Sequence, residues 1–212
     1  MILAIDTTGA YGSIALAHSA GTVDEMPLHA PDGYAHVLFA YIEEILQRNH
    51  AKLADVACFA AAAGPGSFTG VRVGLACIKG LAEAMGKPAI GVSNLQAIAS
   101  FGAAPLRAPV MDARRGEVYG AVYNAAGDLV QREMVAKFPV WLEGLPQGEV
   151  EILSPDFECE GAMVKKTPRA IAAAVARLAA QKLARGEPGD PEKLDANYVR
   201  RSDAELFWKD AG

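Results

Sequence analysis

Cysteine is scarce in this sequence, and the few cysteines lie far apart. Cys58, Cys77 and Cys159 include no C-x-x-C pair, so the sequence predicts neither a disulfide framework nor a zinc site. Cys58 and Cys77 lie within apolar runs and are expected to pack as small core residues. Such cysteine usage is typical of a protein from a reducing compartment.

The sequence also lacks the segments that direct a chain into a membrane. The N-terminus MILAIDTT has no basic region and contains Asp6, which argues against a signal peptide. No apolar run approaches the ~18 residues that a membrane-spanning helix requires. We therefore expect a cytoplasmic protein without a membrane partner.

An excess of positive charge is missing as well. The 212 residues carry 20 Lys and Arg against 25 Asp and Glu, a net charge of -5. The basic pairs at 114–115, 165–166 and 200–201 are far apart in the sequence. Because contacts to phosphate need clustered Lys and Arg, the chain is not expected to bind nucleic acid by itself. What the sequence does have is apolar content, 51% of its residues, which suffices for a sizeable core.

The most informative stretch predicts a strand, a glycine-rich loop and a helix. Residues 56–63 form an apolar run of strand length, residues 64–70 read GPGSFTG, and apolar residues recur at helical spacing over 71–85. This arrangement can aim backbone N–H groups at an anion, and the hydroxyls of Ser67 and Thr69 can donate as well. The glycine spacing matches neither a dinucleotide fingerprint nor a P-loop. A tight turn whose glycines serve backbone geometry alone is the alternative.

The order of predicted elements argues against a doubly wound dinucleotide fold, which would alternate strand and helix from its start. Three strands come first, then a helix, the strand–loop–helix unit, a short strand and a helix that Ser93 caps. The ranges are 2–7, 13–18, 22–29, 34–49, 56–85, 89–92 and 93–100.

A second lobe is predicted after a loop that contains Gly102 and Pro105. Residues 109–135 weakly echo the first three-strand meander, which indicates a duplicated unit. A later helix is predicted to start at Thr167, with Pro168 at its first position. We expect domains at 1–104 and 105–212, the second being the smaller.

Five segments resemble the TsaB family, also called YeaZ, whose members belong to the machinery that makes threonylcarbamoyladenosine in tRNA. The loop and helix, GPGSFTGVRVGLACIKGLA, resemble the family's signature most closely. The resemblance is strong over about the first 125 residues and weaker beyond them. The segments are 1–8, 64–82, 87–99, 110–123 and 197–209.

The resemblance implies the α/β fold of the actin-like ATPases (ASKHA, ribonuclease H-like), with two lobes and a reduced second lobe. In those proteins a nucleotide lies between the lobes, and a carboxylate after the first strand helps to hold hydrated magnesium. Asp6 takes that position here and Asp112 the corresponding one in the second lobe. For Asp112 we favour a structural role, because the adjacent Arg114 and Arg115 offer charge partners. A strand-end carboxylate that accepts local hydrogen bonds is the alternative for Asp6. The candidate vestigial phosphate site comprises Asp6, Thr7, Thr8, Gly64, Gly66, Ser67 and Thr69.

The groups that would perform chemistry are incomplete. The catalytic relative TsaD carries an H-x-x-x-H metal pair, whereas the histidines here, at 18, 29, 36 and 50, have no such spacing. Tyr34 and Ala35 stand where many family members have His-Ser or His-Thr. We therefore expect no catalytic residue, no metal and no cofactor.

The leading hypothesis is a non-catalytic scaffold that binds TsaD and acts with the ATPase TsaE, meeting tRNA only within the complex. Without its partner the same surface should form a homodimer. The two broad apolar helices are the predicted interface, and Leu75→Glu is expected to abolish co-purification with TsaD. The interface residues are Val37, Leu38, Tyr41, Ile45, Val71, Gly74, Leu75, Ile78 and Ala82.

The alternative hypothesis is an enzyme, an actin-like small-molecule kinase or ATPase. It would use Asp6 and the 64–70 loop to bind ATP with magnesium. A protease is not supported, because Ser67 lies in GPGSF and not in G-x-S-x-G.

Overall fold

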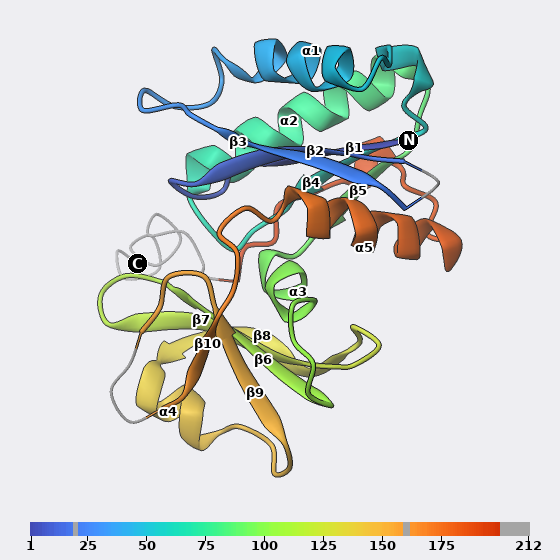
Figure 1. The fold of residues 1–212 in the computed structure, drawn as a ribbon. Coiled ribbons are helices and arrows are strands. Elements are labelled where there is room, and N and C mark those ends of the chain that lie inside the picture. The colour runs from blue at the N-terminus through green and yellow to red at the C-terminus, as the bar shows by residue number, and fades with distance from the viewer. Residues whose placement is uncertain (19–20, 159–161, 200–212) are drawn as a thin grey trace, which may run out of the picture.

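A computed structural model describes residues 1–18, 21–158 and 162–199, and these form two lobes, each built on a five-stranded sheet (Figure 1). The first sheet has the order β3-β2-β1-β4-β5. Strands β1 to β3 form an antiparallel meander, and β4 and β5 extend it in parallel. The strands are β1 (Ile2–Asp6), β2 (Gly12–Ala17), β3 (Val23–Leu28), β4 (Cys58–Ala62) and β5 (Ala89–Val92).

The second sheet repeats this arrangement. Its order is β10-β9-β6-β7-β8, in which β6 to β8 form the antiparallel meander and β9 and β10 the parallel extension. The predicted duplication of the first meander is therefore confirmed. The strands are β6 (Leu106–Asp112), β7 (Glu117–Asn124), β8 (Leu129–Lys137), β9 (Val150–Ser154) and β10 (Val164–Lys166).

Among the described residues, the second lobe has fewer helices than the first. In the first lobe the 18-residue α2 (Phe68–Met85) joins β4 to β5, but the described residues between β9 and β10 form no helix. The remaining helices are α1 (Leu38–Arg48), α3 (Asn94–Ala99), α4 (Phe138–Glu143) and α5 (Ala172–Ala184), with short 3-10 turns η1 (Leu53–Asp55) and η2 (Pro191–Lys193). The prediction of a reduced second lobe agrees with this pattern.

Helices α1 and α2 cover one face of the first sheet, and α5 covers the other (Figure 1). Helix α3, which follows β5, packs against β6 and β7 of the second sheet. Helix α3 follows the first sheet but packs on the second, and helix α5 follows the second sheet but packs on the first. The predicted boundary between 104 and 105 therefore does not separate the lobes, because α5 and the segment after it lie with the first lobe.

The docking of α5 explains why its predicted start is wrong. Helix α5 begins at Ala172 and not at Thr167. Its first N–H groups are satisfied from the first sheet, where Ser13 Oγ accepts from Ala172 N at 3.0 Å and Glu25 Oε1 accepts from Ala173 N at 2.9 Å. A helix N-terminus leaves backbone donors without intrahelical partners, so strands β2 and β3 fix where α5 starts.

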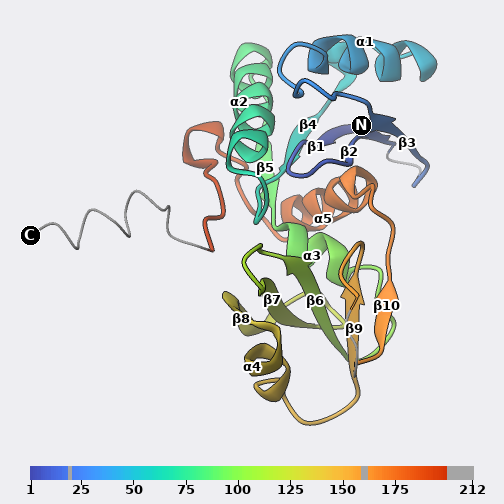
Figure 2. The same ribbon diagram turned by 90° about the vertical axis from the view of Figure 1, so that its left-hand side faces the viewer.

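After α5 the chain runs back along α2 and the edge of β5 (Figure 2). We call residues 187–199 the strap. Lys79 of α2 donates from Nζ to the carbonyl oxygens of Glu192 and Leu194, at 3.3 and 2.9 Å. Gly189 O accepts from Ala89 N of β5 at 2.7 Å, so the strap protects an edge that would otherwise expose unpaired backbone groups. The segment 197–209, which resembles the TsaB family, lies outside the described residues from 200 onward.

Within the described ranges, no helix combines the length and apolar character that crossing a bilayer requires.

Candidate functional site

A cleft of about 710 Å³ opens between the lobes. The β1–β2 turn and the start of α2 form one wall. The β6–β7 turn, the segment directly after β9 and the link from β10 to α5 form the other. Both walls carry polar side chains, and the second carries two arginines and two aspartates. The lining includes Thr7, Thr8, Tyr11, Ser67, Thr69, Met111, Asp112, Arg114, Asp156 and Arg169.

The structure brings most of the predicted phosphate residues to this cleft. Thr7, Thr8, Gly66, Ser67 and Thr69 line it. The other two predicted residues, Asp6 and Gly64, are not part of its lining.

Asp6 is turned inward and is 4% exposed. Its Oδ1 accepts from the backbone N of Thr8 at 2.8 Å and from Thr8 Oγ1 at 2.6 Å. Burial raises the pKa of its carboxyl to about 6, against the effect of these two hydrogen bonds. The alternative expectation of a strand-end carboxylate with local partners is what the structure shows, and the position does not fit a magnesium ligand that faces a nucleotide in the cleft.

Asn94 extends this buried chain of hydrogen bonds, and the sequence analysis did not identify it. Its Nδ2 donates to Thr8 Oγ1 at 2.5 Å, and its Oδ1 accepts from Gly64 N at 3.0 Å. The side chain is buried. Gly64 is therefore held by Asn94 and does not offer its N–H group to an anion. In the sequence, the only indication of this role was that Asn94 is a polar residue directly after the helix cap Ser93.

The glycines of the loop are required by close packing. A Cβ at Gly66 would stand 2.6 Å from the carbonyl oxygen of Thr8, and a Cβ at Gly74 would stand 2.6 Å from Thr7 Oγ1. A Cβ at Gly70 would overlap the carbonyl oxygen of Thr7. Real Cβ atoms do not approach backbone oxygens so closely, so these glycines let α2 pack directly on the end of β1. The tight-turn interpretation accounts for them without a ligand.

Two backbone N–H groups at the start of α2 donate to acceptors within the chain. Ser67 N donates to Thr8 O at 2.6 Å, and Ser67 Oγ accepts from Gly70 N at 3.3 Å as the N-cap of the helix. Thr69 is exposed at the cleft.

On the opposite wall, Asp112 pairs with its neighbour. Its Oδ1 accepts from Arg114 N at 2.8 Å, and its Oδ2 lies 3.5 Å from a guanidinium nitrogen of Arg114. The expectation that an adjacent arginine is its charge partner is confirmed for Arg114. Arg114 and Arg115 both have positive φ, 65° and 56°, a conformation that costs free energy in residues other than glycine.

Tyr34, at the position of the family's histidine, holds the β1–β2 turn. Its hydroxyl donates to Gly9 O at 2.8 Å and accepts from Gly12 N at 2.8 Å. Across the cleft, the guanidinium of Arg169 lies 4.2 Å from the centre of the Tyr11 ring, a cation–π contact between the lobes. These contacts give the cleft wall a fixed shape.

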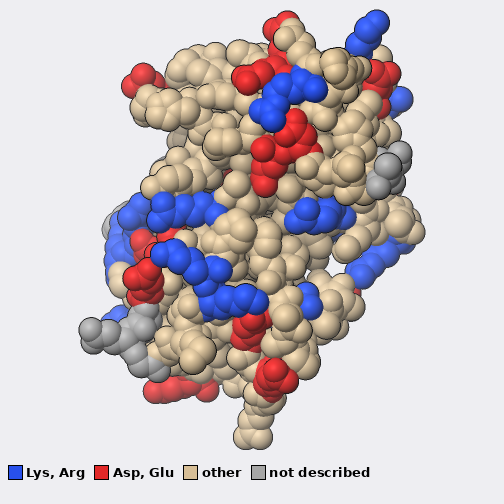
Figure 3. Space-filling model, in the orientation of Figure 1, with Lys and Arg blue, Asp and Glu red and all other residues tan. Residues whose placement is uncertain are grey.

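Charge on this side of the molecule is mixed. Figure 3 shows Lys and Arg side chains gathered at mid-height, between the lobes, with Asp and Glu among them. Among the described residues, no three His, Cys, Asp or Glu side chains come together as a metal site.

Seven of the nine predicted interface residues are buried in the chain's own core. The apolar stripes of α1 and α2 face the first sheet, so these side chains pack in the chain's own core. This burial contradicts their assignment to an interface. Leu75→Glu would place a charge in the core and is not a selective test of binding. The seven are Leu38, Ile45, Val71, Gly74, Leu75, Ile78 and Ala82. Val37 and Tyr41 are half-buried.

Other residues form the outer faces of the two helices. On α1, Phe39 is 63% exposed. On α2, Ala76, Gly80 and Ala84 are exposed, and Cys77 is half-buried beside them. Small residues in succession allow the backbone of another helix to approach closely.

Comparison with known proteins identifies the family. The model of the family described as "TsaD: tRNA N6-adenosine threonylcarbamoyltransferase" matches residues 19–194. The tRNA threonylcarbamoyladenosine biosynthesis protein TsaB of Escherichia coli K12 is 32% identical, over 98% of this chain and 96% of that protein. The structure of YeaZ from Pseudomonas aeruginosa is 26% identical and has a TM-score of 0.77, covering 93% of this chain and 98% of that one.

The transferases themselves match much less of the chain. The tRNA N6-adenosine threonylcarbamoyltransferase of Roseobacter denitrificans is 41% identical over 75 residues, which cover 35% of this chain and 20% of that protein. The two-lobed structure agrees with the actin-like fold that the resemblance implied. The long matches thus run to TsaB and YeaZ, and the chain belongs to the TsaB family within the group that the TsaD model describes.

Proposed function

We propose that this chain is a non-catalytic subunit of the machinery that makes threonylcarbamoyladenosine in tRNA. It binds the transferase TsaD and supports transfer of a threonylcarbamoyl group to the adenosine next to the anticodon. TsaE would act in the same complex, tRNA would be met only there, and the work would take place in the cytoplasm.

The observation that carries this proposal is the contrast in similarity. The TsaB protein of Escherichia coli matches almost the whole chain, whereas the individual transferase of Roseobacter denitrificans matches 35% of it. The cleft supports the same conclusion, because Asp6 is buried against Thr8 and the loop glycines pack on the end of β1.

We propose the outer faces of α1 and α2 as the surface that binds TsaD. Phe39 supplies exposed apolar area, and burying such a side chain contributes roughly 1.5–3 kcal/mol. Ala76 and Gly80 leave room for a partner helix. The two helices predicted from the sequence remain the proposed elements, but the contacting side chains are these outer ones.

Co-purification with TsaD tests the proposal. Ala76→Arg adds a long charged side chain to the outer face of α2 and touches no core residue, so we expect binding to TsaD to be lost. Ala180→Arg is the matched control, because Ala180 is exposed on α5, on the opposite face of the same sheet. Binding retained by both variants would remove this surface from the proposal.

The same face is proposed to pair with a second copy when TsaD is absent. A two-fold dimer uses one patch on both subunits, so a single substitution acts on it twice. Sedimentation of the isolated chain should show Ala76→Arg as a monomer at concentrations where the unchanged chain is a dimer.

The alternative of an ATPase has one supporting observation, the cleft with Thr69, Arg114 and Arg169 on its walls. Against it, the Asp6 carboxylate does not reach the cleft. Calorimetry with ATP and magnesium on the isolated chain separates the two proposals, since saturable binding that Thr69→Val weakens would favour the enzyme.

A further inference from the structure

Glu133 of β8 accepts hydrogen bonds from three separate segments of the chain. Its Oε1 accepts from Ser93 Oγ and, at 2.5 Å, from the hydroxyl of Tyr123. Its Oε2 accepts from Asn197 Nδ2 at 2.6 Å. Burial raises the pKa of Tyr123, so its phenol remains a donor. Hydrogen bonds to an ionised acceptor are stronger than those between neutral groups.

Two of these bonds leave the second lobe. Tyr123 lies in β7, in the same sheet as Glu133, but Ser93 caps α3 directly after β5 of the first lobe. Asn197 lies in the strap, where its backbone N donates to Ala63 O at 2.8 Å and its Nδ2 also lies 3.3 Å from Gly64 O. One carboxylate therefore joins the second sheet to the first lobe and to the strap.

The strap in turn lies against α2. Lys79 donates to two of its carbonyl oxygens. Near its end, Arg72 Nε donates to the hydroxyl of Tyr198 at 3.0 Å, and the rings of Phe68 and Tyr198 lie 5.5 Å apart. These contacts are largely exposed, so they are individually weak.

We propose that Glu133 is a latch through which the second lobe holds the strap against α2. The reduced second lobe then has a structural task in the first lobe, which is to keep the side of α2 and the edge of β5 covered. This inference concerns the isolated chain and does not depend on the proposed partner.

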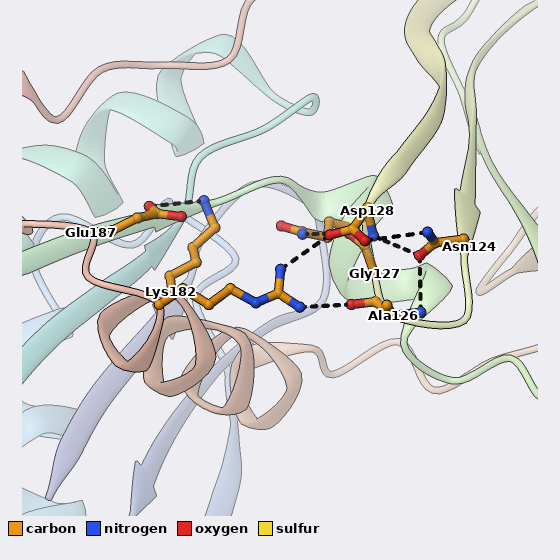
Figure 4. A network of polar contacts seen from close by, with 8 residues as sticks. Asn124, Ala126, Gly127, Asp128, Lys182 and Glu187 are labelled. Atoms are coloured by element: carbon orange, nitrogen blue, oxygen red, sulfur yellow. Dashed lines mark hydrogen bonds and ion pairs between the residues drawn. The ribbon is translucent and has the colours of Figure 1, made fainter.

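Other contacts between the lobes do not pass through Glu133, which makes the latch testable by itself. Arg185 of α5 donates to Asp128 Oδ1 at 3.2 Å and to Ala126 O at 3.1 Å, in the network of Figure 4. Lys182 lies 3.5 Å from Glu187, at the start of the strap. Loss of Glu133 should therefore free the later part of the strap while the lobes stay together.

The four residues of the latch border a second cavity, so the fold should tolerate the loss of the Glu133 side chain. Glu133, Ser93, Tyr123 and Asn197 all line a cavity of about 630 Å³. Water can reach the donors that Glu133→Ala would leave without their acceptor. The variant is expected to remain folded.

Hydrogen exchange of the full chain tests the latch. In Glu133→Ala the backbone N–H groups of Lys193, Leu194 and Asn197, which are hydrogen-bonded here, should exchange about tenfold faster, since loss of a charge-assisted bond changes an opening equilibrium by that order. The N–H groups of β7 and α5 should keep their protection.

Two further variants decide the outcome. Tyr123→Phe removes the bond within the second lobe and leaves the two bonds between lobes, so the strap should stay protected. Asn197→Ala removes the bond from the strap side, together with the longer contact to Gly64 O, and should reproduce the fast exchange without altering β8. Strap exchange that is unchanged in both Glu133→Ala and Asn197→Ala, or equally fast in Tyr123→Phe, would overturn the proposal.

Discussion

Thr7 and Gly70 are fastened together at the point where β1 ends and α2 begins. The hydroxyl of Thr7 donates to Gly70 O at 2.7 Å, and the Cα of Gly70 lies so close to the carbonyl oxygen of Thr7 that a Cβ would overlap it. The backbone of α2 at Gly70 thus lies directly against both the side chain and the carbonyl oxygen of Thr7. The glycine-rich loop is explained by this contact.

Gly70→Ala should destabilise the fold. Because the obstacle is a backbone oxygen of a central strand, relief requires a shift of β1 or α2, and we expect a loss of about 2–3 kcal/mol in the free energy of unfolding. Denaturant titration measures it. Gly80→Ala is the control: its added Cβ meets nothing within 4 Å, so helix propensity should raise stability by about 0.5–1 kcal/mol. Equal effects at the two positions would contradict the packing argument.

Asp6 should make the stability of the protein fall as pH rises through its titration. Its pKa is about 6 in the folded state, whereas an unperturbed aspartate, as in the unfolded chain, has a pKa of 3.8. Between these values the folded state therefore binds more protons than the unfolded state. The contribution of Asp6 to stability is then fully present below pH ~4 and is lost as pH rises through ~6, a change of about 3 kcal/mol.

Asp6→Asn isolates this contribution, because an amide oxygen can still accept from Thr8. The variant should be more stable than the unchanged chain at pH 7, and the difference should vanish near pH 4. Thermal unfolding across this range measures the difference. A difference that does not change with pH would refute the assignment of the raised pKa to Asp6.

Tyr34→Phe should loosen the β1–β2 turn. The variant leaves Gly12 N and Gly9 O without their shared partner, and we expect a loss of about 1–2 kcal/mol, or a few degrees in melting temperature. Tyr41→Phe is the matched control on the adjacent helix. Its hydroxyl bonds the exposed backbone of His29, where water can replace it, so its loss should be smaller.

Ser13→Ala should weaken the docking of α5. Ser13 is fully buried and its hydroxyl caps a helix 159 residues away in sequence. Loss of such a cap costs about 0.5–2 kcal/mol. We expect faster hydrogen exchange in the first turn of α5, starting at Ala172. Ser100→Ala, at an exposed position after α3, should leave that turn unchanged.

The sequence by itself determined the family, the two meanders and the position of the glycine loop, because these depend on local order and on spacing within one segment. It also placed Thr7, Thr8, Ser67 and Thr69 at a common site. The sequence did not give the start of α5, because the side chains that accept from its first N–H groups, Ser13 and Glu25, lie in distant strands.

Which face of each helix is outside was decided by the tertiary structure alone. An apolar stripe on α2 has the same spacing whether it packs on its own sheet or on a partner, so the sequence could not show that Leu75 and Ile78 are core and Ala76 and Gly80 are surface. The burial of Asp6 and the bonds of Glu133 to Ser93 and Asn197 likewise depend on segments that are distant in sequence. Only folding brings those segments to hydrogen-bonding distance.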